Sequence, residues 1–146
     1  MVTEHSLLLV GLGICLGLFF FHRTGYSPGG IITPGFLALE LGSPERVVTA
    51  FVIGGCVAAL LSLVVRVTGA YGRQRTGIAL LLALAFRLFA GGGTTLSYLW
   101  IGWVVPGLIG ADIQRQGAIP TIGAALSTAF ASAMAARLLI SAGVLL

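Results

Sequence analysis

Charged residues are scarce in this sequence, and their scarcity excludes most classes of soluble protein. They make up 8% of the 146 residues, whereas soluble domains carry about 25%. Hydrophobic residues make up 58% of the chain, and its mean hydropathy is +1.08. A polytopic membrane protein is the class that fits this composition.

Lysine is absent, so the net charge of +4 comes from eight arginines against four acidic residues. The arginines are scattered along the chain and form no single basic patch. This distribution argues against nucleic-acid binding, and it favours an interpretation in which arginines mark the loops on one side of a membrane.

The residue sets that most enzymes need are also missing. The sequence contains no Walker loop, no His/Cys/acid set with metal-ligand spacing and no Ser-His-Asp candidate. Its two cysteines, Cys15 and Cys56, fall in apolar runs, where a disulfide is not expected. We therefore predict no catalytic residue, metal site or cofactor in this chain alone.

The apolar residues that are present fall into about six segments, which predict an all-α membrane protein. Their approximate ranges are 6–21, 26–41, 47–65, 76–90, 94–111 and 119–146. The first, third and sixth are long enough to span about 30 Å of hydrocarbon. The second and fifth each contain a Pro-Gly pair, so they either cross as broken helices or enter the membrane and return.

The two Pro-Gly pairs belong to a repeated pattern, G-x-x-x-P-G followed by an acid five residues later. Pro34-Gly35 leads to Glu40, and Pro106-Gly107, 72 positions further on, leads to Asp112. Proline removes a backbone donor and glycine allows conformations closed to other residues. Such breaks either expose helix ends that favour anions or kink a helix to improve its packing.

The placement of arginine favours six crossings with both termini outside. One side then receives Arg23, the loop with Arg66, Arg73 and Arg75, and Arg115. Halves of about 1–73 and 74–146, each with three crossings, must insert with opposite orientation. We therefore predict a single integral membrane domain built as a 3+3 inverted repeat, whose paired broken helices point to a site near the midplane.

Several polar residues within or beside the apolar segments are candidates for function. Asp112 and Arg115 stand at helical i, i+3 spacing, so Arg115 either pairs with Asp112 or binds an anionic ligand. Arg87 either reaches to the outer interface or lines an internal path for anions. Small residues recur every four positions in the first and sixth segments, which favours close helix packing within the chain or in an oligomer.

Four stretches of sequence carry a resemblance to a known family: 23–25, 28–39, 71–73 and 106–117. The most specific part is Ile113-Gln-Arg-Gln-Gly117. Together they closely resemble the CapC/PgsC family, the C subunit of bacterial poly-γ-glutamate synthase in capsule biosynthesis, over essentially the whole chain.

The resemblance implies a multi-pass subunit of the bacterial cell membrane that works with two others. One is an ATP-dependent amide ligase, CapB/PgsB, which would bind the ATP and Mg. The other, CapA/PgsA, is associated with export or anchoring. The complex makes poly-γ-glutamate, a polyanion, and passes it across the membrane, so this chain is expected to have no enzymatic activity by itself.

We predict from these observations that the protein is a scaffold and conduit for the polymer. Two alternatives stay open: a structural anchor for the ligase, and a small transporter or channel of unrelated function. The residues expected to line the polymer path or to dock a partner are Arg23, Pro34, Gly35, Glu40, Arg73, Arg75, Arg87, Pro106, Gly107, Asp112, Gln114, Arg115 and Gln116.

Overall fold

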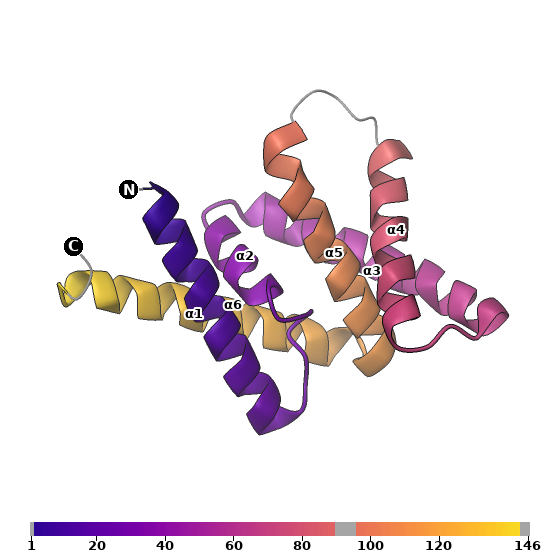
Figure 1. Ribbon diagram of the computed structural model, residues 1–146, viewed down its shortest axis with the longest axis horizontal. Coiled ribbons are helices and arrows are strands. Elements are labelled where there is room, and N and C mark those ends of the chain that lie inside the picture. The colour runs from indigo at the N-terminus through magenta and orange to yellow at the C-terminus, as the bar shows by residue number, and fades with distance from the viewer. Residues whose placement is uncertain (1, 90–95, 144–146) are drawn as a thin grey trace.

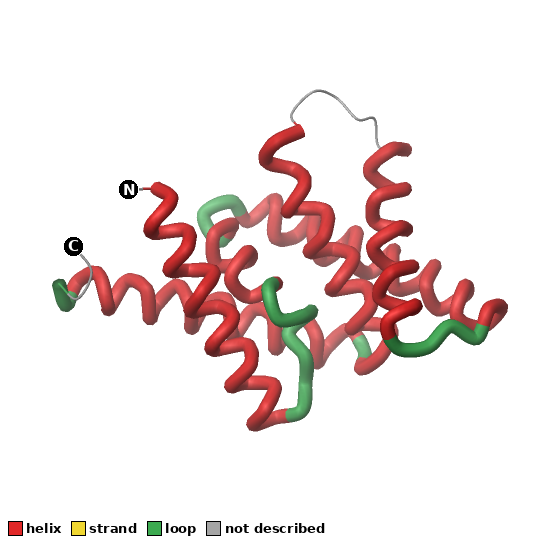
Figure 2. Tube along the Cα trace, in the orientation of Figure 1, coloured by secondary structure: helices red, strands yellow, loops and turns green. Residues whose placement is uncertain are grey.

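A computed structural model describes residues 2–89 and 96–143 of the chain. Six helices account for most of them: α1 (Val2–Thr24), α2 (Thr33–Glu40), α3 (Pro44–Thr68), α4 (Arg73–Phe89), α5 (Leu96–Gln116) and α6 (Ala118–Ser141). Strands are absent from this described part of the chain (Figure 2). The predicted all-α architecture with six segments is confirmed.

Three of the helices, α1, α3 and α6, are long and apolar enough to cross a membrane. They are the three that the sequence predicts. By contrast, α2 has only eight residues, which at 1.5 Å per residue spans about 12 Å. A crossing at the second segment therefore also needs the non-helical residues 25–32.

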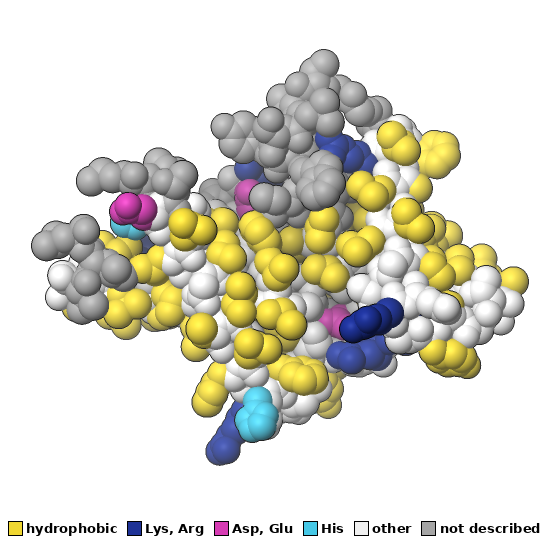
Figure 3. Space-filling view, in the orientation of Figure 1, with side chains coloured by type: hydrophobic (Ala, Val, Ile, Leu, Met, Phe, Trp, Pro, Cys, Tyr) yellow, Lys and Arg dark blue, Asp and Glu magenta, His cyan; other side chains and the backbone are white. Residues whose placement is uncertain are grey.

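The molecular surface is apolar over much of its area. Large hydrophobic side chains such as Phe19, Val52 and Phe130 are exposed, and yellow side chains are spread over much of the visible face in Figure 3. Both cysteines are also exposed and free. A surface of this kind is costly in water and suits contact with lipid.

The two Pro-Gly pairs adopt different structures. Pro34 lies in the first turn of α2, which follows a non-helical stretch, as the prediction of a broken helix requires. Pro106, however, lies inside α5, which is helical from end to end, so the predicted break at the second pair is wrong. The reason lies upstream, because Gly29 and Gly30 with φ of 82° and 98° stop any helix before Pro34. By contrast, residues 99–105 before Pro106 are apolar apart from Gly102.

The glycine of each pair allows two helices to approach closely. A Cβ at Gly35 would lie 2.7 Å from the Cα of Val10 in α1, and one at Gly107 would lie 3.2 Å from the Cα of Leu80 in α4. In both halves, therefore, the Pro-Gly helix packs its glycine against the first helix of the same half.

The six helices form two layers, as Figure 1 shows. In front, α1, α2, α5 and α4 follow one another across the view, and α6 and α3 lie behind them. The third helix of each half packs against the other half, because α3 contacts α4 and α5 while α6 contacts α1 and α2. Equivalent helices also run in opposite directions: α1 descends while α4 rises, α2 rises while α5 descends, and α3 and α6 cross in opposite senses. This arrangement supports the inverted-repeat hypothesis.

Two separate apolar clusters hold these layers together. In one, Val57 and Leu61 of α3 pack with Ala79, Ala83 and Ala111 of α4 and α5. The second cluster contains Ala129 of α6, and Ala133 packs against it. These two residues stand 72 positions after Val57 and Leu61. The other buried members of the second cluster are Leu37, Ala38, Val47 and Ala125.

Candidate functional site

The candidate site is centred on the non-helical stretch 25–32, which is held to the junction of α5 and α6. The backbone N–H of Ser27 donates to Oε1 of Gln116 at 3.0 Å. In return, Nε2 of Gln116 donates to the carbonyl oxygen of Ser27 and to Oγ1 of Thr121, the latter at 3.0 Å. One amide side chain therefore satisfies two backbone groups that a stretch without helical hydrogen bonds leaves open.

Asp112 is the second group that holds this stretch in place. Its Oδ2 accepts a hydrogen bond from the Ser27 hydroxyl, whose oxygen accepts from the N–H of Gly30 at 3.2 Å. The side chain of Asp112 is only 15% exposed, and its Oδ1 lies 3.6 Å from a guanidinium nitrogen of Arg115. The pair expected from i, i+3 spacing is thus confirmed.

The middle of this stretch, residues 27–29, is part of the packed interior, whereas Tyr26 and Ile31 are exposed. Pro28 and Gly29 are buried, and a Cβ at Gly29 would lie 3.0 Å from the side chain of Ile109 in α5. The buried Thr33 donates its hydroxyl to the carbonyl oxygen of Gly29. Residues 27–30 are therefore packed and hydrogen-bonded against α5.

Arginines surround the exposed rim of this cluster. The first turn of α4, with Arg73 and Arg75, comes beside the last turns of α5, because the two helices are antiparallel and Gly107 meets Ala79 and Leu80. Figure 3 shows dark blue side chains beside a magenta one in this region. We call this region, defined by Arg73, Arg75, Asp112, Arg115 and Gln116, the basic end.

Other predicted residues lie on the same side of the molecule or within its core. The C-terminal turn of α1, which carries Arg23, points to the same lower side of Figure 1. Gln114 is mostly buried, and its Oε1 has no hydrogen-bond partner among the described residues. Pro34 and Pro106 are fully buried between helices.

Two predicted residues are separated from the basic end. Glu40 lies at the far end of α2, where it pairs with Arg46 at 3.0 Å. Both side chains are well exposed, at 42% and 68%. Arg87 lies in the last turn of α4, at the opposite end of that helix from Arg73. The structure therefore brings the candidates of the second Pro-Gly copy together and leaves Glu40 and Arg87 apart from them.

Sequence reasoning missed Ser27 and Thr121 as members of the cluster. Ser27 stands 85 positions before Asp112, and neither residue has a periodic neighbour that points to the other. The signal that existed was local, because the run Pro28-Gly29-Gly30 predicts a chain that cannot be helical there. Such a chain needs partners for its backbone groups.

The chemistry of the basic end suits anions. Asp112 is occupied by Ser27 and Arg115, which leaves Arg73 and the outer face of Arg115 to meet carboxylates from solution. Arg115 is 46% exposed, so the contacts it makes are exchangeable rather than tight. Among the described residues, no group of three His, Cys, Asp or Glu side chains is placed to hold a metal ion.

The residues of this site lie in the part of the chain that is similar to known proteins. The family model described as Capsule biosynthesis CapC matches residues 12–122, which include the whole cluster around Ser27. The capsule biosynthesis protein CapC of Bacillus anthracis is 35% identical over 119 residues, 77% of this chain and 80% of that protein. The PGA biosynthesis protein CapC of Bacillus subtilis (strain 168) is 33% identical over 127 residues, 79% of this chain and 82% of that protein. No solved structure matches the chain.

Proposed function

This chain belongs to the CapC family of capsule biosynthesis proteins, and from that premise we propose that it is the multi-pass membrane subunit of a poly-γ-glutamate synthesis and export complex. In this proposal a partner ligase of the CapB/PgsB type supplies the ATP- and Mg-dependent chemistry. A CapA/PgsA-type subunit completes the complex in the bacterial cell membrane. The names of the two Bacillus relatives, which refer to capsule and PGA biosynthesis, support the process.

The observation that carries the proposal is the collection of arginines at the basic end. Arg73 and Arg75 come from α4 and Arg115 from α5, and the three share one side of the molecule with Arg23. A polymer of glutamate carries one carboxylate per residue, so it is drawn to such a surface. Exposed guanidinium groups hold carboxylates weakly enough for each contact to be exchanged as the chain moves.

Asp112 and Ser27 have a supporting role in this mechanism. Asp112 reduces the positive charge beside Arg115 and holds residues 25–32 against α5 through the Ser27 hydroxyl. Arg115 is thereby presented from a helix end held by hydrogen bonds, which lowers the entropic cost of its carboxylate contacts. Ser27 and Asp112 are therefore positioning residues.

The experiment compares two arginines that have the same side-chain chemistry, one inside the basic end and one outside it. Arg115 and Arg46 each pair with one carboxylate and are both well exposed, but only Arg115 belongs to the basic end. In a complex reconstituted with the ligase, ATP and glutamate, we expect Arg115→Ala to lower polymer yield roughly fivefold, as for a contact worth about 1 kcal/mol. Arg46→Ala should leave the yield unchanged.

Co-purification of the ligase with each variant separates synthesis from assembly. Retained ligase with reduced polymer is the expected result for Arg115→Ala. Loss of the ligase itself would instead support the alternative in which this chain only anchors its partner. Equal polymer yields from Arg115→Ala and the unsubstituted protein would contradict the proposal.

A further inference from the structure

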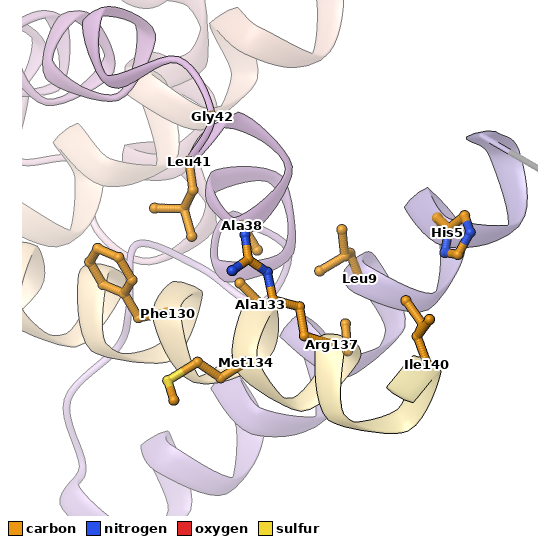
Figure 4. Close-up of a pocket in the computed structure, with 11 residues that line it drawn as sticks. His5, Leu9, Ala38, Leu41, Gly42, Phe130, Ala133, Met134, Arg137 and Ile140 are labelled. Carbon is orange, nitrogen blue, oxygen red and sulfur yellow. The ribbon is translucent and has the colours of Figure 1, made fainter. Parts of the chain in front are cut away.

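A pocket of about 400 Å³ lies between α1, α2 and α6, outside the site described above. Its walls are mostly apolar, with Leu9 from α1, Leu41 directly after α2 and Phe130, Met134 and Ile140 from α6. Figure 4 shows these side chains around an opening that the side chain of Arg137 enters from α6. The imidazole of His5, on α1, forms part of the same lining.

The guanidinium group of Arg137 lacks a compensating charge in the described part of the chain. The acid–base pairs found there are Glu40 with Arg46 and Asp112 with Arg115. Arg137 lies one turn before the end of α6, a helix long and apolar enough to span a membrane. An arginine in such a segment is costly unless an anion or water meets it.

The pocket exists because the two halves differ at equivalent positions. In α3, Leu61 and Val65 fill the cluster against α4, and Leu61 is completely buried. Ala133 and Arg137 stand 72 positions later in α6. Replacing leucine by alanine empties the apolar volume, and replacing valine by arginine brings a cation to its edge. The group of α1, α2 and α6 thus has an apolar cavity with a charged rim at the positions where the group of α3, α4 and α5 has a packed core.

An apolar cavity with a cationic rim is complementary to an amphipathic anion. Both α1 and α6 are candidate membrane spans, so the occupant available along most of their length is lipid. We propose that this pocket binds an anionic phospholipid, with the phosphate near Arg137 and His5 and an acyl chain between Leu9 and Phe130. Arg137 and His5 lie outside residues 12–122 matched by the family model. The proposal therefore concerns a part of the chain that this match does not cover.

The test measures lipid retained by the purified protein in mixed micelles of phosphatidylglycerol and phosphatidylcholine, read by native mass spectrometry. The unsubstituted protein should retain phosphatidylglycerol preferentially. Arg137→Gln should lower that preference about tenfold, because the phosphate loses a charged donor. Arg46→Gln, which removes an exposed arginine from a different helix, should leave the preference unchanged.

Two further variants test the cavity and protect the result against misfolding. Ala133→Leu places in α6 the residue found at the equivalent position of α3, and it should reduce retention of both lipids. Arg137→Lys keeps the charge and should keep the preference. Equal retention of the two lipids by the unsubstituted protein would overturn the proposal. So would an unchanged preference in Arg137→Gln, since phosphatidylglycerol would then be selected without the charge of Arg137.

Discussion

The two copies of the Pro-Gly pattern share the Pro-Gly pair but adopt different structures. Pro34 lies in the first turn of an eight-residue helix, whereas Pro106 is contained in a helix of 21 residues. The acids that follow also differ, because Glu40 forms an exposed surface pair and Asp112 joins a partly buried network. The close helix contact at the glycine is thus common to both copies of the motif. The residues that precede the motif determine whether the helix breaks.

The largest expected difference in stability between the two apolar clusters is at Leu61. Leu61→Ala should lower the free energy of unfolding by about 3 kcal/mol, because a fully buried leucine leaves a cavity. The reverse change at the equivalent position, Ala133→Leu, should alter stability by less than about 1 kcal/mol because it enters an existing pocket. Unfolding in mixed detergent micelles measures both. Equal losses would show that the clusters are packed alike.

The glycines of the two motifs give a second, smaller contrast. Gly35→Ala would place a Cβ 2.7 Å from the backbone of Val10, which cannot yield without moving α1. The nearest atom to a Cβ at Gly107 is the flexible Cδ2 of Leu80, at 3.0 Å. We expect a loss of about 2 kcal/mol for Gly35→Ala and about 1 kcal/mol for Gly107→Ala. The same unfolding assay measures both losses. A larger loss for Gly107→Ala than for Gly35→Ala would contradict this prediction.

The two acids provide the smallest expected difference. Asp112→Ala leaves the Ser27 hydroxyl without its acceptor and should cost about 1.5 kcal/mol. Glu40→Ala removes an exposed ion pair and should cost less than about 0.5 kcal/mol. A double-mutant cycle of Asp112→Ala with Ser27→Ala measures the coupling directly. Additive losses in that cycle would show that Ser27 and Asp112 do not act together.

These contrasts also change the test of the anchor hypothesis. Polar changes at Pro34-Gly35 or Pro106-Gly107 do not distinguish a simple anchor from a conduit. Both prolines are fully buried, so such changes would disturb packing whatever the function. Exposed arginines at the basic end discriminate better, because their replacement changes charge without changing the core.

Local patterns predicted those parts of the fold that depend on neighbours in sequence. The long apolar runs identified α1, α3 and α6 as candidate spans, and i, i+3 spacing identified the pair of Asp112 and Arg115. The break at Pro106 was predicted wrongly because one missing backbone donor does not end a helix whose other residues favour it. The hydrogen bond from Ser27 to Asp112 joins residues 85 positions apart, so no local pattern predicts it.

The amino-acid sequence by itself determined the membrane class, the helical segments and the repeat of 72 positions, because hydropathy and turn residues act over a few neighbours. Only the tertiary structure decided that α3 packs with the second half and α6 with the first. It also decided that one of two equivalent positions becomes a filled core and the other a pocket. Both outcomes depend on which side chains meet across helices that are distant in sequence. The shapes and volumes of those side chains take effect only when the helices pack together.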